Sequence, residues 1–295
     1  MYINNNSMAS NVANNLTSHY SNLSTSTQRL STGLRVNSAA DDAAGLAIRE
    51  LMRTDIKALQ QGVRNANDAI SLIQTADGAL GVIDEKLTRM KELAEQAATG
   101  TYDSTQRLMI ESEYQAMASE ITRIANATDF NGIHLLDGNL SGDTHDGSTM
   151  TATGKMKIHF GTANDSAEDY YYIQIGTSTA SALGVGNETT AGRDGATIST
   201  QEAAQKALVA ITNAVVSKDK IRAHLGALQN RLENTVSNLT TQAENLQAAE
   251  SRISDVDVAT EMTKFVRNQI LTQSSVAMLS QANSMPKMAM QLIGG

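Results

Sequence analysis

Residues 52–90, MRTDIKALQQGVRNANDAISLIQTADGALGVIDEKLTRM, place an apolar side chain at nearly every seventh position. The repeat passes through Met52, Leu59, Ala66, Ile73, Leu80 and Leu87, and Ile56, Val63 and Ile70 fill intermediate positions. Such a heptad pattern predicts a helix that packs lengthwise against other helices. No proline interrupts residues 44–98, so at 1.5 Å per residue the helix is expected to be about 80 Å long.

Local signals predict where this helix begins and ends. Ser38 followed by Asp41 is a capping pattern that predicts the start, and Gly100 stands where a left-handed terminating residue is expected. Asp103 and Gln106 then predict the cap of a further helix. That helix carries apolar residues at helical spacing, namely Tyr114, Met117, Ile121 and Ile124. Its simplest placement is antiparallel against the long helix.

Both ends of the chain repeat leucine every seven residues. The first set is Leu16, Leu23 and Leu30, and the second is Leu225, Leu232, Leu239 and Leu246, followed by Ile253. A final segment places Val258, Met262, Phe265, Val266 and Ile270 on one helical face. Because heptad repeats mark helices that pack on other helices, the two ends are predicted to pack together.

The character of the chain changes in the middle. Residues 137–195 hold 10 of the 20 glycines, and 155–160 and 170–175 resemble short strands. Ser199 and Glu202 then predict a helix cap where the helical pattern resumes. The predicted fold is therefore mainly α. A long antiparallel coiled-coil helical bundle is formed by the N- and C-terminal parts, with a small β-containing insertion between them.

Composition excludes several classes of protein. The 295 residues carry a net charge of -8 and no Cys, which argues against a nucleic-acid binder and excludes disulfides and thiolate metal sites. The sequence contains no run of about 18 apolar residues, so it predicts no membrane-spanning helix. Residues 1–10 have neither the basic nor the apolar region of a secretory signal peptide, so an exported chain is expected to use another route.

Histidines in the insertion are the nearest approach to a metal site. His134, His145 and His159 lie near Asp137, Asp143 and Asp146 in the sequence. No two histidines have the i, i+4 spacing of a helical metal site, and the His-Glu-x-x-His motif is missing. We therefore expect no catalytic, metal-binding or cofactor-binding residue and no enzymatic activity.

The two ends are almost uncharged. Arg29 is the only Lys, Arg, Asp or Glu among residues 1–34, and Lys287 is the only one after Arg267. An exposed helix normally carries charges on its solvent face, so these ends are suited to burial against other helices. The first 35 residues have too few large apolar side chains to offset the entropy of ordering. The hypothesis is that this tail is disordered alone and folds when neighbouring subunits complete its packing, a permanently disordered tail being the alternative.

Completion by other copies has a consequence for assembly. Contacts between unlike surfaces of identical subunits propagate into a helical filament. Closed bundles or discrete coiled-coil trimers are the alternative outcome.

Two segments resemble the terminal signatures of bacterial flagellin. Residues 31–48, STGLRVNSAADDAAGLAI, resemble the N-terminal signature, and residues 259–271 and 277–283 resemble the C-terminal one. The resemblance covers about the first 140 and the last 95 residues. It implies a structural subunit that polymerises into the flagellar filament for motility, with no cofactor.

The resemblance also implies an arrangement. Residues 1–37 and 254–295 would form the coiled-coil inner tube, 38–136 and 199–253 the surrounding shell, and 137–198 a short variable surface domain. The protein would be extracellular, exported unfolded through the flagellar type III apparatus. Its partners would be other copies of itself, an export chaperone on the C-terminal helix at about residues 258–292, and the hook-associated and cap proteins.

These expectations name three sets of residues. The tail interface would use Leu16, Leu23, Leu30, Leu34, Met262, Phe265, Val266, Ile270 and Leu279. Shell packing would use Leu59, Val63, Ile70, Ile73, Leu225, Leu232, Leu239 and Leu246. By resemblance to flagellins seen by the flagellin-sensing Toll-like receptor, a receptor contact would use Arg89, Leu93, Gln96 and Glu113.

Other functions stay open at this point. A hook-filament junction protein would share the terminal helices without forming a long polymer. A cytoplasmic coiled-coil signalling protein of the chemoreceptor type is a second alternative, against which the missing membrane span and the uncharged ends count.

Overall fold

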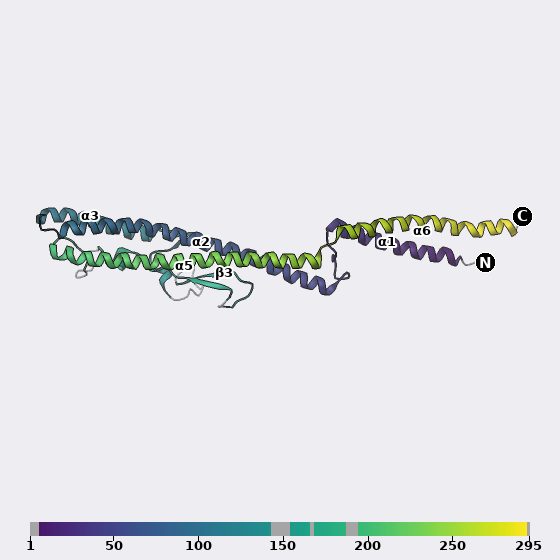
Figure 1. The fold of residues 1–295 in the computed structure, drawn as a ribbon, viewed down its shortest axis with the longest axis horizontal. Helices are drawn as coiled ribbons and strands as arrows, with labels where there is room; N and C mark the ends of the chain where they lie inside the picture. Colours follow the sequence, from purple (N-terminus) through teal and green to yellow (C-terminus); the bar gives the residue numbers. More distant parts are fainter. Residues whose placement is uncertain (1–5, 143–153, 166–167, 187–193, 294–295) are drawn as a thin grey trace. The chain divides into compact units, whose positions relative to one another are not determined.

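A computed structural model describes residues 6–142, 154–165, 168–186 and 194–293. The chain divides into two compact units. One, the terminal unit, contains residues 1–56 and 244–295, and the other, the central unit, contains residues 57–243. Long helices dominate both (Figure 1).

The helices follow the sequence pattern closely. They are α1 (Ser7–Thr32), α2 (Ala43–Ala98), α3 (Ser104–Ala127), the short α4 (Ala180–Leu183), α5 (Gln201–Ser254) and α6 (Val258–Ile293). The 56 residues of α2 form one uninterrupted helix, as the heptad repeat predicts. The predicted mainly α fold with a small β-containing insertion is confirmed.

Helix α2 begins later than the sequence suggests. Ser38 N–H and Oγ both donate to Asp41 Oδ2 at 3.0 Å, but this contact closes a turn before the helix. The capping side chain is Asp42, whose Oδ1 accepts the N–H of Gly45 at 2.9 Å. At the other end Gly100 does not adopt the left-handed conformation expected of it. The shift at the start of α2 is local, because the adjacent Asp41 and Asp42 offer equivalent capping patterns.

The predicted cap of α3 is confirmed, whereas that of α5 lies one residue later than predicted. Asp103 and Gln106 form the predicted capping box of α3. Before α5, Thr200 Oγ1 accepts the N–H of Ala203 at 3.2 Å, so Thr200 caps the helix in place of Ser199.

In the central unit α3 returns antiparallel along α2, as predicted. The Arg89 guanidinium on α2 binds the Glu113 carboxylate on α3 at 2.8 Å. Further along α2, the Ala97 carbonyl accepts a hydrogen bond from Arg107 Nε at 3.0 Å. Because the later residue of α2 meets the earlier residue of α3, the two helices run in opposite directions.

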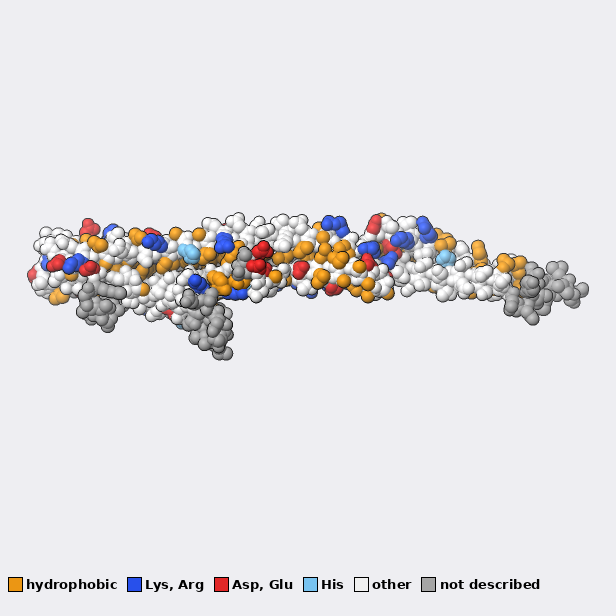
Figure 2. Space-filling view, turned by 90° about the horizontal axis from the view of Figure 1, so that it is seen from below, with side chains coloured by type: hydrophobic (Ala, Val, Ile, Leu, Met, Phe, Trp, Pro, Cys, Tyr) orange, Lys and Arg blue, Asp and Glu red, His pale blue; other side chains and the backbone are white. Residues whose placement is uncertain are grey.

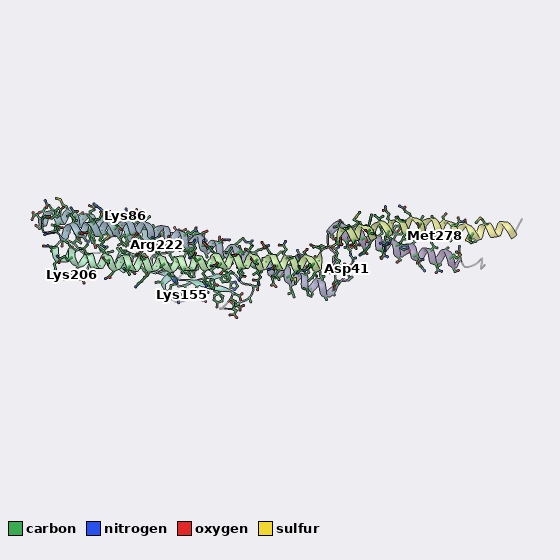
Figure 3. All side chains as sticks on the ribbon, in the orientation of Figure 1. Asp41, Lys86, Lys155, Lys206, Arg222 and Met278 are labelled. Carbon is green, nitrogen blue, oxygen red and sulfur yellow. The ribbon has the colours of Figure 1, made fainter. Side chains whose placement is uncertain are left out.

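Helix α5 also runs antiparallel to α2. Arg222, labelled in Figure 3, donates to both oxygens of Asp77, at 2.6 and 3.1 Å. Lys218 Nζ bonds Asp84 and, at 2.8 Å, Asp219. The hydrogen bond from Arg222 is the main reason why the pKa of Asp77 is lowered. Lys218 is only 1% exposed, so its ammonium group lies within the packed interface between the two helices.

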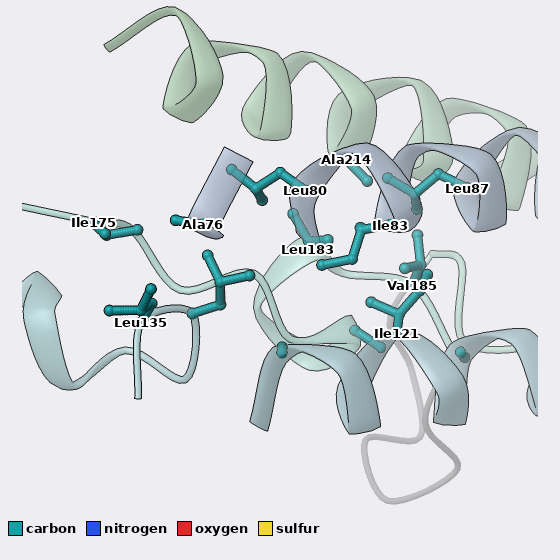
Figure 4. Close-up of a cluster of buried hydrophobic side chains, with 14 of the residues drawn as sticks. Ala76, Leu80, Ile83, Leu87, Ile121, Leu135, Ile175, Leu183, Val185 and Ala214 are labelled. Atoms are coloured by element: carbon teal, nitrogen blue, oxygen red, sulfur yellow. The ribbon is translucent and has the colours of Figure 1, made fainter. Parts of the chain in front are cut away.

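The core of the central unit joins all of its elements. Figure 4 shows side chains of α2, α3 and α5 meeting those of the connecting segments. Fully enclosed members include Leu80, Ile83, Leu87, Ile121, Leu135, Ile175 and Val185. The glycine-rich insertion therefore contributes to the same core as the helices.

A tight hairpin follows α3. Strands β1 (Asp129–Phe130) and β2 (Ile133–His134) pair antiparallel. Between them Asn131 and Gly132 have φ values of 52° and 80°. Two consecutive left-handed residues form the turn that suits a two-residue hairpin, and Asn-Gly is its preferred sequence.

A second hairpin confirms the predicted strands. Strands β3 (Met156–His159) and β4 (Tyr170–Ile173) pair antiparallel, with Met156 opposite Ile173 and His159 opposite Tyr170. Each strand is slightly shorter than predicted.

This β3–β4 hairpin is fixed to both long helices. A Cβ atom added at Gly62 of α2 would lie 2.0 Å from the Phe160 carbonyl oxygen, so only glycine fits there. Asn65 Nδ2 donates to the His159 carbonyl at 2.8 Å. On α5, the Arg231 guanidinium lies 3.5 Å from the centre of the Tyr171 ring. These contacts hold the β3–β4 hairpin against α2 and α5.

The return from the insertion is fastened to α3. Tyr114, fully buried, donates from its hydroxyl to the Gly195 carbonyl at 2.7 Å. Burial raises the pKa of Tyr114, which keeps its hydroxyl protonated as a donor. One turn earlier, the Glu111 carboxylate accepts the N–H of Ile198.

Candidate assembly surface

The terminal unit is built around α1 and α6, which pack side by side and antiparallel; we refer to them as the terminal pair (Figure 1). Ser26 Oγ donates to Glu261 Oε1 at 2.7 Å. Asn6 Nδ2 donates to the Ala282 carbonyl at 2.8 Å. The cap at the start of α1 thus meets a late residue of α6, and a late residue of α1 meets an early one of α6, so the two helices run in opposite directions.

The buried contacts of the terminal pair are small or polar. The described residues of α1 and α6 that are buried are Ser26, Glu261, Thr272 and Ala282. No large apolar side chain of either helix is buried among them. Small side chains allow the helices to approach closely, but they bury little apolar area, so the pair gains little hydrophobic stabilisation from its own contact.

Glu261 is the charged group buried in this contact. It is 3% exposed and accepts hydrogen bonds from Ser26 and, at 3.1 Å, from Lys264 Nζ. Burial acts to raise the pKa of Glu261, but the bonds from Ser26 and Lys264 and the charge of Arg29 outweigh it, so the pKa is lowered. The carboxylate is therefore ionised at neutral pH and ties the two helices together.

The solvent-exposed surface of the terminal pair differs from its buried contact, because it carries large apolar side chains. On α6 they recur every four residues as Val258, Met262, Val266 and Ile270, which are 57, 44, 44 and 57% exposed; we call these four residues the outer row. Tyr20 on α1 and Met278 on α6 are also exposed, the latter labelled in Figure 3. Exposed apolar side chains arranged in this way make the outer row a candidate surface for contact with another protein.

The surface around these side chains is mainly uncharged. Beyond a group of charged residues near its start, the terminal pair shows polar and hydrophobic side chains with almost no acidic or basic ones (Figure 2). This agrees with the lack of charge in the sequence of both ends.

The predicted tail residues divide between the two surfaces. Leu16, Leu23, Leu30, Leu34, Phe265 and Leu279 are half-buried within the terminal unit. Met262, Val266 and Ile270 are exposed. The leucine repeat thus lies at the boundary between the internal contact and the outside.

Two short linkers of the terminal unit pair with each other, a feature that the sequence did not reveal. Arg35 N–H donates to the Ser254 carbonyl at 2.7 Å, and Val256 N–H donates to the Gly33 carbonyl at 3.0 Å. Leu34 and Asp255 form an isolated β-bridge between them. Pairing between segments so far apart in the chain leaves no local sequence signal.

Buried Arg49 supports the first linker. Its Nη1 donates to the Val36 carbonyl at 2.7 Å, and its Nη2 binds the Glu50 carboxylate at 2.8 Å. An arginine in the first turns of a helix is ordinary in sequence, so this role was also missed.

The predicted shell residues lie in or beside buried contacts. Leu59, Ile73, Leu225, Leu232 and Leu239 are buried, whereas Val63, Ile70 and Leu246 are half-buried. These side chains therefore pack within the chain, and little of their surface is left for a neighbour.

The residues proposed for receptor contact are brought together on α2 and α3, but not all are accessible. Arg89 and Glu113 form an exposed ion pair, and Gln96 donates to the Tyr102 hydroxyl at 3.0 Å on the surface. Leu93 is 1% exposed and belongs to the core. A partner would meet the polar members and not the leucine.

No metal centre is formed by the part of the chain that the structure describes. His134 is exposed at the end of β2, His159 stacks near Tyr170, and His145 lies outside the described residues. Within the described ranges, no helix combines the length and the apolar character needed to cross a membrane.

Comparison with known proteins identifies two regions. Residues 3–141 match the bacterial flagellin N-terminal helical region, and residues 208–293 match the bacterial flagellin C-terminal helical region. The flagellar filament core protein flaB2 of Brachyspira hyodysenteriae is 40% identical over 99% of this chain and 100% of its own length. The flagellin of Bacillus subtilis is 41% identical over 99% of this chain and 100% of its own length.

The fold is also found among solved structures. One of them is a putative flagellar hook-associated protein from Vibrio parahaemolyticus, with a TM-score of 0.55 and 13% identity, covering 73% of this chain and all of that one.

Proposed function

Because this chain belongs to the bacterial flagellin family and is a structural, non-enzymatic subunit of the flagellar filament, we propose that the terminal pair is the surface through which its copies join. The observation that carries this proposal is the outer row on α6. Four large apolar side chains remain in solvent beside an internal contact made of small and polar residues. Contact with neighbouring copies would remove them from water.

The proposed layers follow from this assignment. Residues 1–37 and 254–295 form the inner tube of the filament, 38–136 and 199–253 the shell around it, and 137–198 the outward surface. The supporting observation is burial. Leu225 and Leu232 of the shell helices are buried within the chain, whereas no large apolar side chain in the described part of α6 is buried.

Truncation tests this function directly. A chain lacking residues 257–295 should form no filaments by electron microscopy, while circular dichroism still reports the helices of the central unit. Persisting filaments would contradict the role of the terminal pair.

A milder variant addresses the outer row itself. Replacing Val266 and Ile270 by Ser should raise the critical concentration for polymerisation about tenfold or more, because burial of each side chain then contributes less. The matched control replaces Gln269 and Gln273, exposed polar residues of the same helix, by Ser and should leave it unchanged. Equal effects of the two variants would show that the apolar row is not used.

Folding on assembly is the second part of the proposal. Since α1 buries only Ser26 among its residues, the terminal pair should be poorly ordered in a dilute single chain and helical in the filament. Far-ultraviolet circular dichroism of both states measures this. Equal helicity per residue would leave assembly without a folding step.

Export and its partners complete the proposal. The chain leaves the cell unfolded through the flagellar type III apparatus and becomes extracellular, and an export chaperone covers residues 258–292 before assembly. The exposed outer row supports this, because it would otherwise join copies too early. Hook-associated and cap proteins would meet the same terminal surfaces at the ends of the filament.

Recognition by the flagellin-sensing Toll-like receptor is proposed for the face formed by Arg89, Gln96 and Glu113, with Leu93 supporting that face from the core. Arg89→Ala should reduce receptor activation by the single chain. Arg123→Ala, which removes an exposed arginine from α3, is the control. Equal activation by both variants would oppose this contact.

A further inference from the structure

The single proline of this 295-residue chain lies inside a helix. Pro286 stands within α6, which continues to Ile293. Proline has no backbone N–H, and its ring crowds the carbonyl four residues earlier, so a helix interior is its least favourable position. A residue that weakens the helix at this place calls for a compensating contact.

The carbonyl affected by Pro286 is that of Ala282. In a regular helix the N–H of residue 286 would donate to the oxygen of residue 282. Pro286 removes that donor, and Ala282 is buried in the terminal pair. A buried carbonyl that lacks a partner is costly, so a donor from another element is needed.

Asn6 supplies the missing donor. Its Nδ2 donates to the Ala282 oxygen at 2.8 Å across the terminal pair. Its Oδ1 accepts the N–H of Ala9 at 3.0 Å and thereby caps the start of α1. One amide side chain therefore starts α1 and binds the carbonyl that Pro286 leaves free on α6. An amide carries its donor and its acceptor on separate atoms, whereas Ser and Thr carry both on one oxygen and an ionised Asp has no donor.

A second contact shows that this bond belongs to a defined register. Ser26 on α1 meets Glu261 on α6. Moving along α1 from Asn6 to Ser26 is 20 residues, and moving back along α6 from Ala282 to Glu261 is 21. The two hydrogen bonds therefore agree on one antiparallel alignment and mark its two ends.

We propose that Pro286 and Asn6 form a register latch, in which proline removes the regular helical donor to the Ala282 carbonyl, and the bond from Asn6 that replaces it fixes where this end of α1 lies along α6. The inference rests on the proposed function of the terminal pair and adds how its alignment is specified. Sliding α1 by one helix turn would change little apolar contact in an interface of small and polar side chains, so the register depends on single polar contacts such as these two. A free carbonyl at one position distinguishes the correct alignment from its neighbours. The alignment in turn decides which side chains stand beside the outer row when other copies arrive.

A double-mutant cycle tests the latch on the full chain. Asn6→Asp keeps a good capping residue but replaces the amide donor by a second acceptor facing Ala282. We expect its critical concentration for elongation from wild-type seeds to rise about tenfold, as for the loss of a partly buried hydrogen bond that leaves an acceptor unpaired. Asn11→Asp makes the same chemical change at an exposed site of α1 and should have little effect.

The deciding arm is Asn6→Asp combined with Pro286→Ala. The Pro286→Ala substitution restores a backbone N–H to the Ala282 carbonyl, so in that background Asn6→Asp should change the critical concentration no more than about twofold. An equal effect of Asn6→Asp in the chains with and without Pro286→Ala would overturn the latch.

The outcomes separate this inference from the proposed function. If Asn6→Asp elongates like the wild type while the chain lacking residues 257–295 does not, the latch is wrong and the terminal pair remains the assembly surface. If the truncated chain polymerises, the assembly surface itself is wrong.

Discussion

At the residue scale, the smallest side chains fix the closest approaches in this molecule. Gly62 admits the Phe160 carbonyl to the surface of α2, and Ser26 admits the Glu261 carboxylate to the surface of α1. Both positions lie within helices, where sequence reasoning looks for large apolar residues. Small residues in a helix have no distinctive pattern, so their importance follows only from the partner that approaches them.

Two glycines of α2 provide a matched pair of predictions. Gly62→Ala should lower the free energy of unfolding by about 2 kcal/mol, because the new methyl group overlaps the Phe160 carbonyl. Gly78→Ala, with no atom within 4 Å of the added Cβ, should raise it by about 1 kcal/mol through helix propensity. Thermal unfolding of the single chain measures both. Destabilisation by Gly78→Ala, or none by Gly62→Ala, would contradict the close approach.

At the element scale, the long helices and the β3–β4 hairpin could be predicted, because a heptad repeat and short alternating strands are local properties. The capping residue at a helix start could not be predicted where two candidates are adjacent, as with Asp41 and Asp42 or Ser199 and Thr200. The polar contact of the terminal pair could not be predicted. Its residues, such as Glu261 and Thr272, are ordinary helix residues until α1 lies against them.

Substitutions of Lys218 test how the interface between α2 and α5 tolerates a buried charge. Its stem packs between α2 and α5, and its ammonium reaches Asp84 and Asp219. Lys218→Met keeps the stem and should change the free energy of unfolding by less than about 1 kcal/mol, since burying the charges offsets much of their attraction. Lys218→Ala leaves a cavity and should cost about 2–4 kcal/mol. Denaturant unfolding distinguishes them, and equal losses would show that the ion pairs, not the packing, stabilise this site.

At the scale of the whole molecule, each of the two units has its own kind of stabilisation. The central unit joins α2, α3, α5 and the insertion in one apolar core. The terminal unit lacks such a core in the described parts of α1 and α6 and relies on polar contacts. In such a subunit the central unit is stable by itself, and the terminal unit gains stability from contact with other copies. This is consistent with a filament that grows by addition of single chains.

Acid should weaken both units through their carboxylates. The pKa of Asp77 in the central unit and that of Glu261 in the terminal unit are both lowered. A carboxyl group whose pKa is lower in the folded chain stabilises the fold above its unfolded pKa of about 4, and this stabilisation disappears as pH falls through the folded pKa. The melting temperature of the single chain, which reports the central unit, should therefore stay level from pH 7 to 5 and fall below about pH 4.

Asp77→Asn should lower the melting temperature at pH 7 and make the acid decline shallower, because one of the titrating groups is gone. Filament dissociation should respond instead to Glu261→Gln, since Glu261 lies in the terminal pair. Scanning calorimetry of the single chain and turbidity of filaments across pH give the two measurements, and an acid decline of the same steepness in the Asp77→Asn chain would show that Asp77 does not contribute to it.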